Sequence, residues 1–115
     1  MPITPIQTLE IIEVMENFLS RIRPPEDIRD KLDIGYTIDN QSIIIFEIRP
    51  QWNKPEVIQE HPFAKTTFIK AKNCWKVFWM RANSNWHPYS PQSKVESLPE
   101  FIQLVEDDKH HCFRG

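Results

Sequence analysis

The N-terminal part of the chain has the apolar period of an amphipathic helix. Apolar residues recur at steps of three and four, which places them on one side of a helix. Thr4, Pro5 and Gln7 have the spacing of a capping box with proline in the first turn. Pro24 and Pro25 interrupt the period and end the helix. The inward stripe that we predict consists of Leu9, Ile12, Met15, Leu19 and Ile22.

A second, shorter helix is predicted directly after the two prolines. Residues 25–32 read PEDIRDKL, with proline at the first position and acidic residues in the first turn, as helix N-termini prefer. Ile28 and Leu32 are four positions apart, so we expect both to face inward.

The pattern then changes to the runs of β-branched and aromatic residues that are typical of strands. Two such runs within 34–50 meet at Asp39-Asn40, a pair that suits a tight hairpin turn. Two more, 65–71 and 74–81, meet at Lys72-Asn73. These four runs predict two antiparallel hairpins.

The remaining segments between the helices are less regular. A short fifth strand is expected at 85–89, where Pro88 favours the edge of a sheet. Residues 50–64 hold three prolines and are expected to form a structured loop. Ser97 and Glu100 form a second capping box, which predicts a C-terminal helix. The inward stripe of that helix is Leu98, Phe101, Ile102 and Val105, and a polar tail follows.

The order of these elements predicts the fold class. Sequential strands joined by short turns pair antiparallel, and helices at both ends of the chain are available to cover the sheet. We therefore predict an α+β fold, an antiparallel four- to five-stranded meander with N-terminal helices and a C-terminal helix. A chain of 115 residues is expected to form a single domain, 1–115.

The two central strands are apolar on both faces. Odd-numbered residues share one face of each strand. On that face the strand 42–49 ends in Glu47 and Arg49, and the strand 74–81 ends in Arg81. Such a sheet is covered on both sides, or it is covered on one side and binds a ligand or partner on the other. If the two strands are neighbours, the charged ends of their odd faces converge. Whether His87 shares that face depends on the turn at 82–85, because a shift of one residue reverses every side chain.

Charge is distributed unevenly along the chain. The formal net charge is −2, which argues against a strongly basic nucleic-acid-binding protein. Residues 61–95, however, carry six bases and no acid, whereas residues 1–60 carry eleven acids and six bases. An aromatic and purely basic middle segment therefore lies between two acidic ends.

The sequence also bears on location. No apolar run approaches the length of a membrane span, and the N-terminus lacks the basic-then-apolar order of a signal peptide. The two cysteines, Cys74 and Cys112, do not make a disulfide framework. We expect a cytoplasmic protein with reduced thiols and no membrane contact.

Several of these motifs together resemble a known family. The strand ending in F-E-x-R-P-x-W, then W-x-x-x-W-x-R, then W-H-x-Y and an aromatic near the C-terminus are similar to the domain-of-unknown-function 3024 family, a group of small bacterial proteins. The likeness covers nearly the whole chain beyond the first helix and departs at Arg114, where the family tends to carry tryptophan. The resemblance supports a single domain and implies no activity, cofactor or substrate. The matching residues are Phe46, Glu47, Arg49, Pro50, Trp52, Trp75, Trp79, Arg81, Trp86, His87, Tyr89, Phe113 and Gly115.

The polar and aromatic residues of these motifs are the candidate site. They are Glu47, Arg49, Trp52, Arg81, Trp86, His87 and Tyr89. One interpretation is structural, with Glu47 and the arginines paired and the tryptophans in the core. A second is a protein partner or homodimer surface, because exposed Trp, Tyr and Arg are enriched at interface hot spots.

Two further interpretations stay open. In a nucleic-acid or polyanion surface, Lys70, Lys72, Lys76 and Arg81 would contact phosphates while Trp75, Trp79 or Trp86 stack on bases. A small enzyme would use Glu47 and His87 for acid–base chemistry with Arg49 or Arg81 as an anion clamp. No known catalytic motif supports this last hypothesis.

We interpret the protein as a non-enzymatic binding or assembly module without metal or cofactor. The sequence His110-His111-Cys112 lacks a second ligand pair at zinc-finger spacing, and we expect it to lie in a solvated tail. Trp75, Phe78 and Trp79 are expected to be mostly core, while Arg81, Trp86, His87 and Tyr89 are expected to face a partner.

Overall fold

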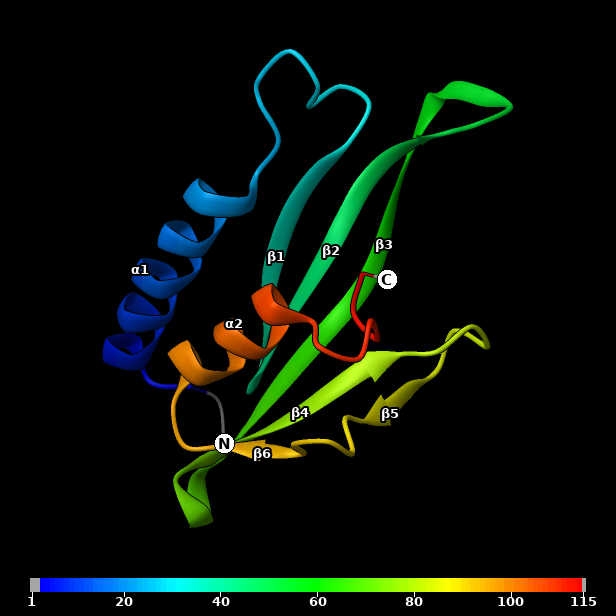
Figure 1. Ribbon diagram of the computed structural model, residues 1–115. Coiled ribbons are helices and arrows are strands. Elements are labelled where there is room, and N and C mark those ends of the chain that lie inside the picture. The colour runs from blue at the N-terminus through cyan, green and yellow to red at the C-terminus, as the bar shows by residue number, and fades with distance from the viewer. Residues whose placement is uncertain (1–2, 115) are drawn as a thin grey trace.

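The computed structural model describes residues 3–114, so Gly115 of the family motif lies outside the described residues. Within that range the chain forms two α-helices, a short 3₁₀ turn and six strands (Figure 1). In chain order they are α1 (Pro5–Ile22), β1 (Asp33–Asp39), β2 (Ser42–Gln51), β3 (Lys54–Ile69), η1 (Lys70–Lys72), β4 (Cys74–Met80), β5 (Trp86–Pro88), β6 (Lys94–Val95) and α2 (Leu98–Asp107).

The strands form one antiparallel sheet in meander order. Its order is β1-β2-β3-β4-β5, and β6 pairs with β4 beside β5. Asn40 and Asn73 adopt positive φ angles at the two predicted hairpin turns, which asparagine tolerates. The α+β meander is therefore confirmed, with β5 at the edge of the sheet as Pro88 indicated. The two-residue strand β6 was not predicted.

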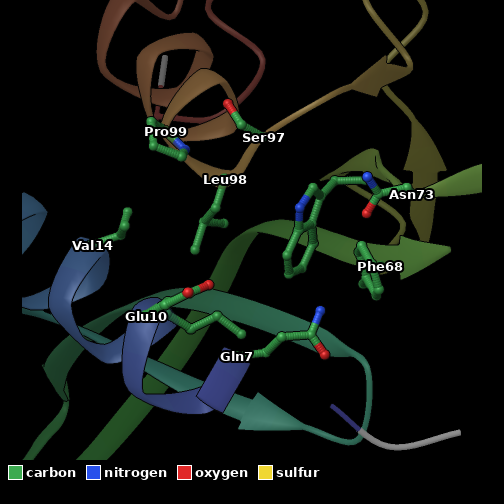
Figure 2. Close-up of a pocket in the computed structure, with 10 residues that line it drawn as sticks. Gln7, Glu10, Val14, Phe68, Asn73, Ser97, Leu98 and Pro99 are labelled. Carbon is green, nitrogen blue, oxygen red and sulfur yellow. The ribbon is translucent and has the colours of Figure 1, made fainter. Parts of the chain in front are cut away.

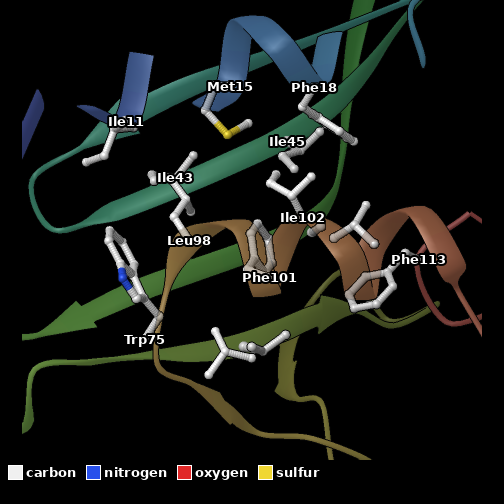
Figure 3. Close-up of a cluster of buried hydrophobic side chains, with 14 of the residues drawn as sticks. Ile11, Met15, Phe18, Ile43, Ile45, Trp75, Leu98, Phe101, Ile102 and Phe113 are labelled. Carbon is white, nitrogen blue, oxygen red and sulfur yellow. The ribbon is translucent and has the colours of Figure 1, made fainter. Parts of the chain in front are cut away.

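Both helices cover the same face of the sheet, which we call the helix-bearing face (Figures 1 and 3). α1 and α2 contact each other and bury their apolar sides on the odd positions of β2 and β4. Figure 3 shows these side chains pointing toward one another between the layers. The most deeply buried ones are Met15, Phe18, Ile43, Ile45, Val77 and Phe101.

The inward stripe of α1 differs from the predicted one. The buried residues are Ile11, Met15 and Phe18, whereas Leu9 is 70% exposed and Ile12 is 38% exposed. The predicted capping box of Thr4 and Gln7 is present in full. α1 is apolar on more than one side, so the three- and four-residue period fits two stripes. Only the packing against β1 and α2 selects one of them.

The predicted second helix at 25–32 is wrong, and this segment forms successive turns. A short helix needs tertiary burial to be stable. Ile28 finds no such burial, since it is 42% exposed. Arg29 instead donates from Nε to the Pro24 carbonyl oxygen at 2.9 Å, which holds the connection to β1 in place.

The predicted loop at 50–64 is also wrong, because β2 and β3 continue as a long hairpin arm beyond the rest of the sheet (Figure 1). β4 pairs only with residues 64–69 of β3. The arm segment 54–63 therefore pairs with β2 alone and keeps one free edge. Pro55 and Pro62 are tolerated there because an edge strand does not need every backbone N–H.

The C-terminal tail folds back onto the body instead of extending into solvent. Phe113 is only 5% exposed and joins the core. The Asp108 carboxylate accepts hydrogen bonds from the backbone N–H groups of Phe113 and Arg114, each at 3.0 Å. These bonds place Arg114 against β2 and β3.

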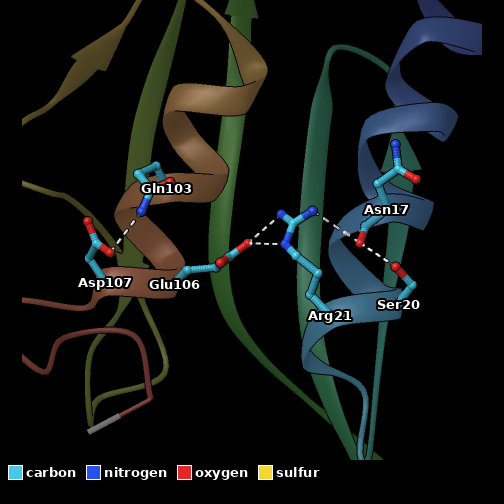
Figure 4. A network of polar contacts seen from close by, with 6 residues as sticks. All are labelled: Asn17, Ser20, Arg21, Gln103, Glu106 and Asp107. Atoms are coloured by element: carbon cyan, nitrogen blue, oxygen red, sulfur yellow. Dashed lines mark hydrogen bonds and ion pairs between the residues drawn. The ribbon is translucent and has the colours of Figure 1, made fainter.

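A polar clamp joins the C-terminal ends of the two helices (Figure 4). Arg21 donates from Nε to a Glu106 carboxylate oxygen at 3.1 Å, and its second guanidinium nitrogen contacts the same oxygen. The Asn17 carbonyl oxygen accepts a further hydrogen bond from Arg21. The clamp therefore ties the ends of α1 and α2 together above the apolar core.

An ion pair links the end of α1 to β1 and makes stability depend on pH. Arg23 donates twice to the Asp33 carboxylate, at 2.7 Å each, and these bonds hold the pKa of Asp33 below its ordinary value of 3.8. A depressed carboxyl pKa stabilises the fold above that ordinary value, and the contribution is lost as the pH falls through the folded-state pKa.

We therefore expect Asp33→Asn to lower the melting temperature at about pH 7 and to lose most of that effect at about pH 2. Thermal melts of the wild type and the variant at both pH values measure the difference. Asp30→Asn is the control, because Asp30 is exposed and has no ion pair in the part of the chain that the structure describes. If Asp33→Asn lowered the melting temperature equally at both pH values, the Asp33 charge would not be the cause.

Candidate functional site

The structure separates the predicted site residues into four places. Glu47, Arg49, Arg81 and His87 lie toward one end of the helix-bearing face. Trp86 lies on the opposite face, Trp52 lies at the turn of the hairpin arm, and Tyr89 is in the core. No single surface therefore presents all seven.

The charged end of the helix-bearing face centres on Glu47. Its carboxylate lies 3.3 Å from Arg49 and 3.5 Å from Arg114, and its side chain is 21% exposed. The Arg114 guanidinium carbon also lies 5.8 Å from the centre of the Phe63 ring. The pairing of Glu47 with Arg49 fits the structural interpretation, whereas no local pattern indicates Arg114, which lies 67 positions after Glu47.

His87 pairs across the strands with Trp79, which puts it on the same face as Glu47. Its Nε2 atom is buried and has no hydrogen-bond partner in residues 3–114. The Arg81 guanidinium carbon lies 5.6 Å from the centre of the Trp79 ring. Glu47 is held by arginines and makes no hydrogen bond with His87 in this range, so the two do not form an acid–base pair.

Tyr89 is 2% exposed, which corrects the expectation that it faces a partner. Its ring centre lies 4.8 Å from that of Phe113, and burial raises the pKa of its phenol. The direction of the chain after β5 sends this side chain under the C-terminal tail. Tyr89 therefore anchors the tail and is not available as a contact residue.

The face opposite the helices, which we call the open face, carries apolar and aromatic side chains without a covering layer. It is formed by the even positions of β2 and β4 and by their cross-strand partners. The larger side chains on it pack among themselves, and all except Phe46, which is 9% exposed, are partly exposed. They are Ile44, Phe46, Ile48, Lys65, Phe78, Met80 and Trp86.

Lys65 lies at the centre of the open face between two aromatic rings. Its Nζ atom is 4.8 Å from the centre of Phe78 and 5.0 Å from that of Trp86. Desolvation lowers the pKa of this ammonium group, and the charge of Asp39 offsets the change in part. Lys65 has no ion pair among the described residues, so its charge is stabilised by the two ring faces and by the more distant charge of Asp39.

A second group of lysines adjoins this centre. Lys76 and Lys94 are cross-strand partners on the open face. Together with Lys72, Phe78 and Pro88 they line a hollow of about 310 Å³ that no acidic side chain lines. The acid-free segment of the sequence thus gives the β4 side of the open face a positive charge.

A family model described as Domain of unknown function (DUF3024) matches residues 3–115. The chain belongs to this family. No curated protein and no solved structure matches the chain.

The motif residues of this DUF3024 chain lie on both faces of the sheet. Phe46 lies on the open face, and its ring crosses over Gly35 of β1. A Cβ atom at Gly35 would be 3.0 Å from Phe46 Cε2, so a larger residue there would push the ring away by a few tenths of an ångström. Trp75 and Phe113 belong to the core on the other face. The expectation that Trp75 is core is confirmed, while Phe78 lies on the open face and Trp79 is only partly buried.

A separate hollow of about 260 Å³ lies between the N-terminal ends of α1 and α2 (Figure 2). Its floor is apolar and includes Phe68, Trp75 and Leu98. Gln7 and Ser97 on its rim are occupied by hydrogen bonds to Thr4 and Glu100. Three segments that are distant along the chain form this hollow, so no local sequence pattern predicts it.

The described part of the chain holds no group of three or more His, Cys, Asp or Glu side chains that could bind a metal ion. Burial raises the pKa of the Cys112 thiol. Among the described residues, no helix is both long and apolar enough to cross a membrane.

Proposed function

We propose that this protein is a non-enzymatic binding or assembly module that uses the open face to hold a protein partner or a second copy. The observation that carries the proposal is the position of both helices on the other face. It leaves Phe78, Met80 and Trp86 at the surface around Lys65. Uncovered sheet faces with aromatic residues are typical of interaction sites. The proposal keeps the single domain and the cytoplasmic location expected from the sequence.

A nucleic-acid or polyanion ligand is the second candidate, and the lysine-lined hollow favours it. Base stacking requires free aromatic ring faces. On the open face Lys65 lies over the rings of both Phe78 and Trp86, so a base would have to displace it. Trp75 is buried in the core and is not available for stacking. We therefore place a protein ligand first.

An enzyme that uses Glu47 and His87 with Arg49 or Arg81 has the weakest support. A general base must reach the proton that it removes, and Glu47 is occupied by Arg49 and Arg114. The buried Nε2 atom of His87 adds no accessible base. These contacts favour a structural role for the charged end of the helix-bearing face.

The proposal is tested by capture with two matched tryptophan variants. Immobilised wild type, Trp86→Ser and Trp52→Ser are incubated with extract of the native cells, with and without nuclease. We expect a bound protein that Trp86→Ser loses and Trp52→Ser, altered at the 91% exposed hairpin turn, retains. If nuclease treatment alone removes the bound protein from the wild type, the ligand is nucleic acid. If only Trp52→Ser loses the bound protein, the binding site lies on the hairpin arm.

A further inference from the structure

α1 presents a second apolar stripe to solvent, on the side away from its core contacts. Ile6, Leu9 and Ile12 are 72%, 70% and 38% exposed. They recur every three residues, so they lie along one side of the helix. A surface helix normally has one apolar stripe, and contiguous apolar surface beyond it marks an interaction site.

Acidic side chains flank this exposed apolar stripe. Glu10, Glu13 and Glu16 are exposed on the same helix, close to the apolar residues in sequence and in helical position. The single base of α1, Arg21, is held by Glu106. Arg23, directly after α1, interacts electrostatically with Glu16 but is paired with Asp33. α1 thus presents apolar side chains together with a net negative charge.

The open face has the opposite charge and a matching apolar character. Lys65, Lys76 and Lys94 lie on it beside Phe78 and Trp86, while Asp39 and Glu60 lie toward its margins. A helix laid on a sheet is also the usual way in which an uncovered apolar sheet face is buried.

Building on the proposed function, we infer that the open face of one copy receives the exposed, acidic stripe of α1 from a second copy. Glu13 and Glu16 then approach the lysines, and Leu9 and Ile12 cover the aromatic side chains. This contact supplies a carboxylate to the half-buried Lys65 ammonium group.

The geometry of the chain determines how such copies assemble. The stripe of α1 faces away from the sheet, and the open face is on the far side of the sheet. Because the two surfaces lie on opposite sides of one rigid molecule, two copies cannot satisfy both contacts with each other. The assembly is therefore head-to-tail, and it grows into a ring or a chain of more than two copies.

Light scattering after gel filtration, from about 10 µM to about 1 mM protein, measures this assembly. We expect the mean mass to rise with concentration above twice the 13.8 kDa of one chain at low salt. The mass should fall toward one chain at about 1 M salt, because salt screens the charge pairing. A wild type that stays at one chain throughout would overturn the inference.

Two variants, each with one surface disabled, give the sharpest test. Leu9→Lys disables the stripe and Lys65→Glu disables the open face, so each alone should stay at 13.8 kDa. Mixed together, they retain one intact stripe and one intact face, and should form a one-to-one pair and nothing larger. Ile28→Lys, at another exposed apolar position, should assemble like the wild type.

The outcomes separate this inference from the proposed function. Self-association that Lys65→Glu abolishes and Leu9→Lys leaves unchanged would mean face-to-face pairing, which overturns the role of α1. If Lys65→Glu lowers the melting temperature, Trp86→Ser replaces it as the face variant. A monomeric wild type whose capture still depends on Trp86 would overturn self-assembly and retain the open face as a site for another protein.

Discussion

Replacing Phe101 with alanine should cost the fold about 3–5 kcal/mol, the usual range for a fully buried phenylalanine. Phe101 has no exposed surface and comes from α2, where it fills the space between the helices and the sheet (Figure 3). Small proteins are stable by only about 5–15 kcal/mol, so this loss removes a large part of the total. Urea unfolding followed by circular dichroism measures it.

Phe78→Ala is the matched control, because it removes the same side chain from the open face. Phe78 is partly exposed and its partners are Lys65 and neighbouring strand residues. We expect a loss of about 1 kcal/mol for it in dilute protein. If the two variants unfolded at the same urea concentration, the core would not lie on the side of the sheet that we assign to it.

Replacing Trp75 with alanine should also cost about 3–5 kcal/mol. Trp75 is 7% exposed, and its ring centre lies 5.0 Å from that of Phe68. It also lines the hollow between the helix N-termini, so its removal opens the core to water from that side. Urea unfolding followed by tryptophan fluorescence measures the effect.

Trp52→Ala tests the same change at a position without burial. Trp52 is 91% exposed, so the free energy of unfolding should change by less than about 0.5 kcal/mol. Emission of the folded variant should move to shorter wavelength, because a water-exposed tryptophan has been removed. A large destabilisation by Trp52→Ala would show that the arm packs against something in solution.

Helix caps and tight turns could be predicted, because each of these residue patterns is compatible with only one local structure. Thr4 and Gln7 cap α1 as their spacing indicated, and Asn40 and Asn73 adopt the positive φ angles of the predicted turns. Pro88 placed β5 at an edge correctly. At Ser97 the prediction held in part, since its side chain reaches Glu100 but caps no backbone N–H.

Predictions failed where the residue pattern was compatible with more than one structure. α1 has apolar residues for two stripes, and the choice of Ile11 over Leu9 depends on what α1 packs against. The prolines of 50–64 suggested a loop, because a sequence does not reveal that this part of β3 has a neighbour on only one side.

The candidate site shows the same division. The sequence by itself determined that Glu47 and Arg49 lie on one face and that residues 61–95 are basic, because strand alternation and charge are local properties. Only the tertiary structure decided that Tyr89 is buried, that Arg114 reaches Glu47, and that Lys65 lies between Phe78 and Trp86. These contacts join strands and termini that are distant along the chain, and their register depends on turns and bulges that reverse a face with a single residue.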